Sequence, residues 1–394
     1  MNNSQPATES RSRRNPDINP RDLPDGLANR PISVRPDTKL RDEAILVKGE
    51  SGPLGPLYAF DGDRPEDSEL QGRSVHRVLR EWRDWMIGYE NSHLEYESPD
   101  GEIERGPLEN SYQQQYQKRY YAKIKDWERG IERELQDLTT VMLTFSASSE
   151  NAKGGRRCPA DHMRDVADGY QTAYATLWNV LDGYEWDYAK VWEPHQSGYG
   201  HMHVAVAVED PAGTISPETF RPVMQSYVRN VDPAGSEAHG LTTPGLGDAV
   251  SVNDDVENLG SYIAEYVGMF GEEALDRSIT TQLFYATCWA TGTRRVEFSG
   301  RAQDRIAREQ FRRETGLRPV DRGGSTFDQW RGGEGESPPA NTGGREGGEG
   351  GRWRVDSICT VRRSEPHYSD PTAGGQRLTE IDGRTGVDPP PVRE

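Results

Sequence analysis

The chain has 394 residues, a formal net charge of −18 and only 33% hydrophobic residues, with 42 glycines and 26 prolines. This length allows one large domain or two ordinary ones, but the composition predicts that part of the chain joins no core. Three widely spaced cysteines argue against a disulfide framework, and no run is apolar enough to span a bilayer or to serve as a secretory signal, so we expect a cytoplasmic protein with no membrane partner.

The basic residues are mostly arginine, since only seven of the 47 are lysine. An acidic chain with little lysine and low hydrophobicity resembles the proteins of salt-loving archaea. In molar salt the Debye length is about 3 Å, so distant negative charges repel DNA only weakly. The net charge therefore does not exclude a nucleic-acid partner.

The N-terminal third is expected to consist of a disordered segment followed by a helical region. Residues 1–40 are rich in proline, aspartate and arginine without any periodicity, which predicts disorder. Residues 41–138 form a helical N-terminal region, with helices over 75–89 and 109–138 and a polar connector between them.

Residues 139–300 alternate between strand and helix patterns and predict one α+β domain. The expected strands are 139–148, 186–194, 201–208 and the short segment RRVEFS, and the expected helices are 162–184, 216–231, 256–270 and ITTQLFYATCWATGT. The short gap between 194 and 201 makes the second and third strands a hairpin. A basic helix at 301–320 and a glycine- and proline-rich, mostly disordered tail at 321–394 follow, with one possible strand at 353–363.

Two histidines, His201 and His203, stand one residue apart in the third of these strands. Residues two apart in a strand face the same side, so both imidazoles can contact one divalent ion. A hairpin centred near Ser197 places Glu193 opposite His201 as a third ligand, and His195 in the turn is the competing candidate. The pattern alone also occurs in ordinary edge strands, so the metal interpretation needs a second motif.

Spacing excludes several families that use such a histidine pair. Histidine-triad nucleotide hydrolases need a third histidine at the position of Ala205, and cupins need an acidic residue closer to the pair than Glu209. Conjugative relaxases place their tyrosine ahead of the histidines. In this chain Tyr262 and Tyr266 follow the histidines, four residues apart on a predicted helix, so both phenols share one helix face.

The order TTVMLTFSAS, WEPHQSGYGHMHVAV and SYIAEYVG resembles the three motifs of HUH rolling-circle replication initiators, the Rep endonucleases of plasmids and single-stranded-DNA phages. The spacing is most similar to phage initiators and to Rep proteins of halophilic archaeal plasmids. The resemblance covers about 139–300 and implies an antiparallel sheet with a central HxH strand and packed helices, of the ferredoxin-like or RRM-like kind.

The resemblance implies that His201, His203 and Glu193 bind Mg²⁺ or Mn²⁺ and that Tyr266 and Tyr262 are the nucleophiles, with Tyr266 cutting first. The substrate would be single-stranded or hairpin origin DNA, and the product a 5′-phosphotyrosine link and a 3′ hydroxyl. No glycine precedes a lysine anywhere in the chain, so a Walker A loop is lacking and a host helicase and DNA polymerase are expected partners.

The chain departs from that family beside the tyrosines, where Glu265 and Met269 replace the usual lysines. Their role in offsetting phosphate charge would pass to an arginine such as Arg294 or Arg295. A second set of candidates for DNA contact lies at helical spacing further on and comprises Arg301, Arg305, Arg308 and Arg312, with a weaker cluster at Lys118, Lys123 and Lys125.

Three other functions share part of this pattern. A transposase of the same nuclease class shares every motif and differs only in the DNA that it recognises. A non-catalytic origin-binding or copy-control protein would keep the fold and lose the chemistry, and an unrelated metal hydrolase would keep only the ion. Cys158 and His162 lack the second ligand pair that a structural zinc site needs.

Overall fold

The computed structural model describes residues 18–38, 40, 72–90, 92–97, 103–107, 110–253, 273–316 and 354–360, with side chains left aside at 89–97, 103–107 and 354–360. Its centre is a five-stranded antiparallel sheet of order β6-β3-β5-β4-β7. The strands are β3 (Leu138–Phe145), β4 (Trp186–Pro194), β5 (Gly200–Glu209), β6 (Val250–Asn253) and β7 (Val296–Phe298). The predicted α+β class and the central position of the HxH strand β5 are confirmed.

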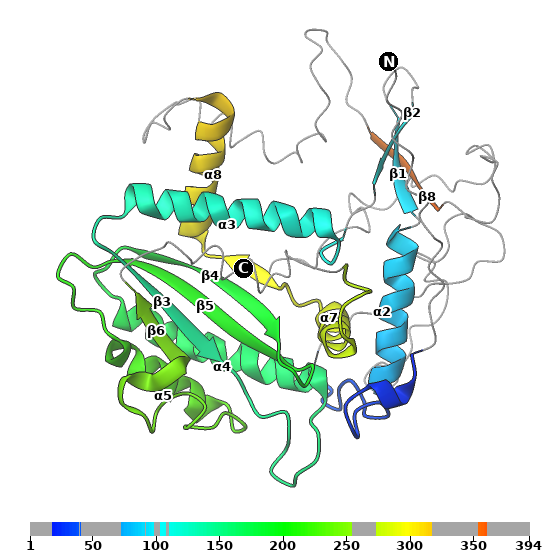
Figure 1. Ribbon diagram of the computed structural model, residues 1–394, viewed down its shortest axis with the longest axis horizontal. Coiled ribbons are helices and arrows are strands. Elements are labelled where there is room, and N and C mark those ends of the chain that lie inside the picture. The colour runs from blue at the N-terminus through cyan, green and yellow to red at the C-terminus, as the bar shows by residue number, and fades with distance from the viewer. Residues whose placement is uncertain are drawn as a thin grey trace, which may run out of the picture.

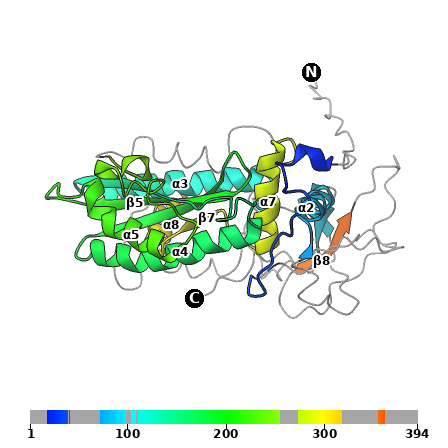
Figure 2. The ribbon, with the colours of Figure 1, turned by 90° about the horizontal axis from the view of Figure 1, so that it is seen from below.

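Helices cover both faces of this sheet, as Figures 1 and 2 show. One face packs against α4 (Pro159–Val180), η2 (Pro217–Phe220), α5 (Arg221–Asn230) and α7 (Ile279–Thr291), and the other against α3 (Gln114–Glu134) and α8 (Gly300–Thr315). Strand alternation separates the two cores: Val204 and Val206 face α4, whereas Ala205 and Ala207 face α3. The small alanines let α3 approach the sheet closely enough to bury Trp127 completely.

A second, three-stranded sheet has the order β2-β1-β8. It consists of β1 (Ser92–Glu97), β2 (Ile103–Pro107) and β8 (Arg354–Thr360), and α2 (Val75–Glu90) precedes it. The polar connector expected within 41–138 is therefore wrong, because it contains two paired strands, whereas the strand considered at 353–363 is confirmed. No helix within the described ranges is long and apolar enough to cross a membrane.

Part of the N-terminal segment expected to be disordered is packed. Leu27 and Ile32 are fully buried in the main core, and a short helix η1 (Pro20–Asp22) precedes them. The carboxylate of Asp161 at the start of α4 accepts hydrogen bonds from the backbone N–H of Val34 at 3.0 Å and the hydroxyl of Thr38 at 2.8 Å. The sequence does not predict this packing, because the apolar residues are irregularly spaced and the contacts are to a carboxylate distant in sequence, so no periodic pattern results.

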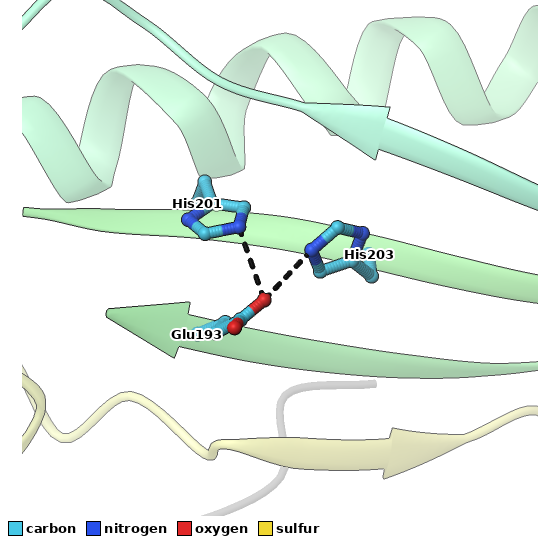
Figure 3. Close-up of side chains that lie close together, drawn as sticks. All are labelled: Glu193, His201 and His203. Carbon is cyan, nitrogen blue, oxygen red and sulfur yellow. Dashed lines mark hydrogen bonds and ion pairs between the residues drawn. The ribbon is translucent and has the colours of Figure 1, made fainter. Parts of the chain in front are cut away.

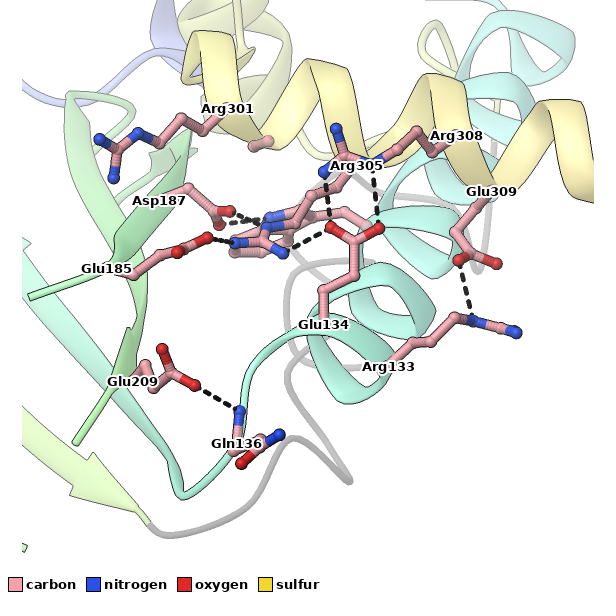
Figure 4. Close-up of polar contacts among 12 residues, drawn as sticks. Arg133, Glu134, Gln136, Glu185, Asp187, Glu209, Arg301, Arg305, Arg308 and Glu309 are labelled. Carbon is pink, nitrogen blue, oxygen red and sulfur yellow. Dashed lines mark hydrogen bonds and ion pairs between the residues drawn. The ribbon is translucent and has the colours of Figure 1, made fainter. Parts of the chain in front are cut away.

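A buried ion-pair cluster joins α3, β4 and α8 at one end of the sheet (Figure 4). The guanidinium of Arg305, which is 2% exposed, donates to Asp187 at 2.5 Å, Glu134 at 2.7 Å and Glu185 at 2.7 Å. The indole N–H of Trp127 donates to the same Asp187 carboxylate at 2.7 Å. One arginine thus ties two helices to the strand that carries Glu193 further along.

This cluster corrects the expected DNA-binding stripe on α8. Arg305 is enclosed by carboxylates and cannot reach an external phosphate, and Arg308 and Arg312 donate to Glu134 at 2.9 and 3.5 Å. Their charges are matched within the fold because acidic residues distant in sequence meet this helix face. Of the four, Arg301 is the one whose residue is exposed, with a single long hydrogen bond to a backbone carbonyl at 3.5 Å.

Replacing Arg305 by methionine should lower the free energy of unfolding by about 3–5 kcal/mol, because it leaves buried carboxylates without their cation. The exposed Arg301→Met variant is the matched control and should change stability by less than about 0.5 kcal/mol. Urea unfolding at constant molar KCl measures both. Equal effects of the two substitutions would show that the cluster contributes nothing specific.

Candidate metal centre

The hairpin between β4 and β5 brings the predicted ligands together. Glu193 pairs directly with His201 in the strand register, as expected from a turn centred near Ser197. Gly198 in this turn has a φ of +83°, and a Cβ there would lie 2.9 Å from the Leu283 side chain and 3.1 Å from the Thr280 carbonyl of the α7 segment. The turn therefore needs glycine, both for its left-handed backbone and for its contact with α7.

The three side chains converge on one point (Figure 3). The Oε2 atom of Glu193 lies 3.1 Å from Nε2 of His201 and 2.9 Å from Nε2 of His203. The potential ligand atoms of all three residues lie within 4.8 Å of one another. Two bonds of about 2.1 Å at a right angle place neighbouring ligands about 3.0 Å apart, so these separations fit adjacent positions around one divalent ion.

Contacts behind the cluster orient its rings. Nδ1 of His203 lies 3.1 Å from the hydroxyl of Thr144, which faces it from β3. Without a cation the Nε2–H of His203 donates to Glu193; with a cation held at Nε2, the proton would be on Nδ1, which would then donate to the Thr144 hydroxyl. Nδ1 of His201 is buried and has no hydrogen-bond partner within the described residues.

The carboxylate of Glu193 is suited to hold a cation. Burial raises the pKa of Glu193, but hydrogen bonds from His201 and His203 more than offset this and keep the pKa below its ordinary value. The group is therefore ionised at neutral pH. Two imidazoles and one carboxylate are a donor set for a borderline or hard divalent ion with further positions left for substrate oxygen atoms or water.

His195, the competing ligand, stands apart from this cluster. Its ring centre is 6.1 Å from that of His201, and its Nδ1 lies 3.2 Å from the hydroxyl of Ser197 within the turn. The geometry thus favours Glu193 as the third ligand.

Tyr262 and Tyr266 lie outside the described residues, in the stretch 254–272. The residue before this stretch, Asn253, ends β6 on the same sheet, and the strand register puts its Cα about 16 Å from that of His203. After the stretch the chain enters α7, whose first turn contacts the β4–β5 turn. One flank of the tyrosine segment thus ends on β6, two strands away from β5, and the other leads into α7, which contacts the β4–β5 turn.

Arg294 lies at the edge of the site. The backbone N–H of Trp192 donates to the carbonyl of Arg295 at 2.8 Å, which extends the β4–β7 ladder by one residue and places the backbone of Arg294 alongside Glu193. Its side chain is partly exposed, so it remains a candidate for phosphate contact.

Arg295 does not fit the expected DNA contact. It is only 8% exposed, and its guanidinium lies over the rings of Tyr112 and Tyr285, 5.1 and 4.7 Å from their centres. It also donates to the backbone carbonyl of Ser111. The arginine is enclosed by aromatic rings because α2, α3 and α7 meet at this position.

His162 supports the start of β5 from the opposite side of the sheet. Nε2 of its buried ring donates to the carbonyl of Gly200 at 2.9 Å, next to His201, and Arg157 approaches Nδ1 at 3.3 Å. Burial lowers the pKa of His162 to about 4, so the ring is neutral in the folded protein. Neither it nor Thr144 was assigned a role from the sequence; only the alternation of β3 opposite β5 could have singled out Thr144.

Comparison with known proteins identifies the family. Residues 67–319 match the family described as "Putative rep protein (DUF1424)", and the chain belongs to this family of Rep proteins. It is 31% identical over 310 residues to an "Uncharacterized 36 kDa protein" of Halobacterium salinarum, covering 76% of this chain and 88% of that protein. A protein of the same description from Halobacterium sp. (strain GN101) is 30% identical over 253 residues, covering 59% of this chain and 76% of that protein.

No solved structure matches the chain. The family description supports a replication initiator, in agreement with the motif order in the sequence. Both relatives come from Halobacterium, which agrees with the lysine-poor, acidic composition.

Thr144→Val should weaken binding of Mn²⁺ about 10- to 100-fold, because His203 loses the acceptor that fixes its ring. Thr140→Val, four residues earlier on the same face of β3, is the matched control and should leave affinity unchanged. Isothermal titration of each protein with Mn²⁺ measures the effect. If the two variants bind Mn²⁺ equally well, Thr144 does not orient the ligand.

The neutral His162 predicts a loss of stability in acid. The unfolded chain takes up a proton on this residue near pH 6.5 and the folded protein only near pH 4, so its contribution is complete above pH 6.5 and is lost as the pH falls toward 4. The loss amounts to about 3 kcal/mol. In urea unfolding between pH 7 and 4, His162→Gln should show a shallower pH dependence than the wild type; an unchanged slope would contradict this assignment.

Proposed function

We propose that this protein initiates rolling-circle replication by nicking single-stranded origin DNA and remaining attached to the new 5′ end through tyrosine. The observation that carries the proposal is the His201, His203 and Glu193 cluster on the central hairpin of a Rep-family chain. Tyrosine nucleophiles, four residues apart and downstream of the cluster in sequence, complete the set of groups that such a reaction needs.

The cluster would hold Mg²⁺ or Mn²⁺ through the two Nε2 atoms and one carboxylate oxygen. The chemistry that such an ion supplies when bound is withdrawal of negative charge from a phosphodiester, which makes attack by a phenol feasible. The chain's own part is to fix the three donors: Thr144 sets the ring of His203, and the β4–β5 register sets Glu193.

The proposed nick is a transesterification. The phenolic oxygen of Tyr266 attacks phosphorus, the bond from phosphorus to the 3′ oxygen breaks, and the phenolic proton is ultimately replaced by one on the departing 3′ hydroxyl. The number of phosphoester bonds is unchanged, so the link can be reversed when strands are rejoined. Tyr262 would attack in a second round, after synthesis has regenerated the origin.

The chain allows Tyr266 to reach the cluster. Six residues lie between it and Glu273, where the described chain resumes ahead of α7, and the seven Cα-to-Cα steps span at most about 24 Å. The contact between the start of α7 and the β4–β5 turn supports this part of the proposal, because it ties the segment after the tyrosines to the hairpin that carries the cluster.

Arg294 is the proposed replacement for the family's lysines near the tyrosines. Glu265 and Met269 carry no positive charge, whereas the backbone of Arg294 lies beside Glu193 where the β4–β7 pairing is extended. A guanidinium there can donate to two phosphate oxygens at once. Arg301 remains a candidate for a more distant phosphate contact.

The partners follow from the products. A free 3′ hydroxyl is a primer for a host DNA polymerase, and strand separation would fall to a host helicase because the chain lacks a Walker A sequence. The Rep-family description favours a replication origin over the transposon end that a transposase of the same class would cut. The loss of lysine beside the tyrosines is the feature that favours a non-catalytic origin-binding protein instead.

Covalent capture separates these functions. The full-length protein is incubated with Mn²⁺ and 3′-labelled single-stranded oligonucleotides that tile both strands of the DNA flanking its gene, and the products are run on a denaturing gel. We expect a labelled protein adduct that disappears with EDTA, in Tyr266→Phe or in the Tyr262→Phe/Tyr266→Phe double variant, and in His201→Ala.

Tyr184→Phe, which removes a surface hydroxyl bonded to Thr214, controls for tyrosine substitution as such and should keep the adduct. A mobility shift on a native gel without any adduct would support the non-catalytic alternative and refute nicking. An adduct that survives the double tyrosine substitution would refute the assignment of the nucleophiles.

A further inference from the structure

Helix α3 runs antiparallel to β4 (Figure 1), so the helix begins near the end of β4 that bears Glu193 and ends near the start of that strand. At the C-terminal end of the helix, Glu134 shares Arg305 with the start of β4, and Trp127 bonds to Asp187. From Trp127 back to Tyr116 the helix rises about 16 Å, and from Asp187 on to Glu193 the strand rises about 20 Å. The first turns of α3 therefore lie close to the end of β4 that bears Glu193.

This part of α3 has an unusual charge. About one residue in six of the whole chain is acidic, yet residues 110–125 contain none and carry Lys118, Arg119, Lys123 and Lys125. Lys125 pairs with Glu128, whereas Lys118 and Lys123 are exposed and form no ion pair within the described part of the chain. The N-terminal end of a helix already bears a positive partial charge, so helix stability does not explain this group of cations.

Two tyrosines accompany the cations. The rings of Tyr116 and Tyr120 are stacked with centres 4.7 Å apart, and the Tyr116 hydroxyl donates to that of Tyr120 at 3.0 Å. Arg119 lies over the ring of Tyr116 and Lys123 over that of Tyr120, at 5.6 and 5.5 Å. The proton of the Tyr120 hydroxyl has no acceptor among the described residues and is available to an external oxygen.

Tyr120 also packs against the core that contains Val191 and Val296, and Val191 is the strand partner of His203. Tyr116 lies one turn nearer the helix start, and the positive charges of Arg295 and Arg294 act against the rise in its pKa. The tyrosine pair thus lies on the face of the sheet that carries the histidine cluster, toward the end of β4 that bears Glu193.

We propose that Tyr116, Tyr120, Arg119 and Lys123, which share one side of α3, form a platform that binds single-stranded DNA next to the nicking site. This inference rests on the proposed function and adds the path of the strand. Lysine and arginine would contact successive phosphates, and the tyrosine hydroxyls and ring edges would contact sugar and base without reading sequence. In concentrated salt only such close contacts retain their strength.

Tyr116 and Tyr120 have a different role from that of the proposed nucleophiles. Burial beside Tyr120 raises the pKa of Tyr116, so its phenol stays protonated and acts as a hydrogen-bond donor. Tyr116→Phe and Tyr120→Phe should therefore weaken binding without abolishing the covalent adduct at saturating DNA.

The test measures binding alone, in EDTA, with the full-length protein and a fluorescein-labelled dT20 oligonucleotide as the probe. Arg119→Gln/Lys123→Gln should weaken binding about tenfold and lower the slope of log affinity against log salt by about 1.4, since each phosphate contact to a single strand contributes about 0.7. Arg229→Gln, at an exposed position on α5 across the sheet, is the control for loss of a positive charge away from the platform and should bind as the wild type does.

A second measurement locates the strand. Photo-cross-linking with 5-iodouracil in place of thymine should label a peptide that contains Tyr116 or Tyr120. Labels confined to other segments, no binding of dT20, or equal losses in the Arg119→Gln/Lys123→Gln and Arg229→Gln variants would overturn the platform. Because binding in EDTA needs no chemistry, platform labelling without a covalent adduct would refute nicking alone, and an adduct with labels elsewhere would refute the platform alone.

Discussion

The candidate metal centre depends on the register of the β4–β5 hairpin. Glu193 can bridge His201 and His203 because β4 and β5 pair without a bulge from Trp186 to Pro194. A slip of one residue would turn Glu193 to the α4 face of the sheet, away from both imidazoles. The rest of the fold can be understood as fixing this register: Gly198 closes the turn against α7, and the Arg305 cluster ties the far end of β4 to two helices.

The two faces of the sheet differ in role: one forms the larger apolar core, and the other bears the candidate metal centre. The face toward α4, α5 and α7 is the larger apolar core, and it holds the packed N-terminal segment as well. The face toward α3 and α8 has a small core of alanine, valine and Trp127 that gives way at one end to His201, His203 and Glu193. On this second face, the ion pairs with α8 involve the C-terminal half of α3, and the exposed cations lie in the N-terminal half of the same helix. Similar arginine- and lysine-rich patterns thus serve stability at one end and, in our proposal, DNA binding at the other.

Particular residues show what the sequence could and could not predict. The pairing of Glu193 with His201 was predictable because a strand repeats every two residues and a short turn leaves little choice of register. The role of Arg305 was not, because helical spacing reveals which arginines share a face but not that Asp187, Glu134 and Glu185 meet that face in the fold. The same reason hid Thr144, which contacts His203 across 59 residues of sequence. The packed segment around Leu27 was hidden by its proline-rich composition, and the places of Tyr262 and Tyr266 remain a prediction.

The central claim is that one cation at the histidine pair lies within reach of both tyrosines. Crystals of the full chain grown with Mn²⁺ and a single-stranded oligonucleotide, measured at the manganese absorption edge, test it most directly. The account predicts one anomalous peak bonded to Nε2 of His201, Nε2 of His203 and a Glu193 oxygen, with the phenolic oxygen of Tyr266 directed at a phosphate on that ion. A peak at other residues, or Tyr266 on the α4 face of the sheet, would contradict it.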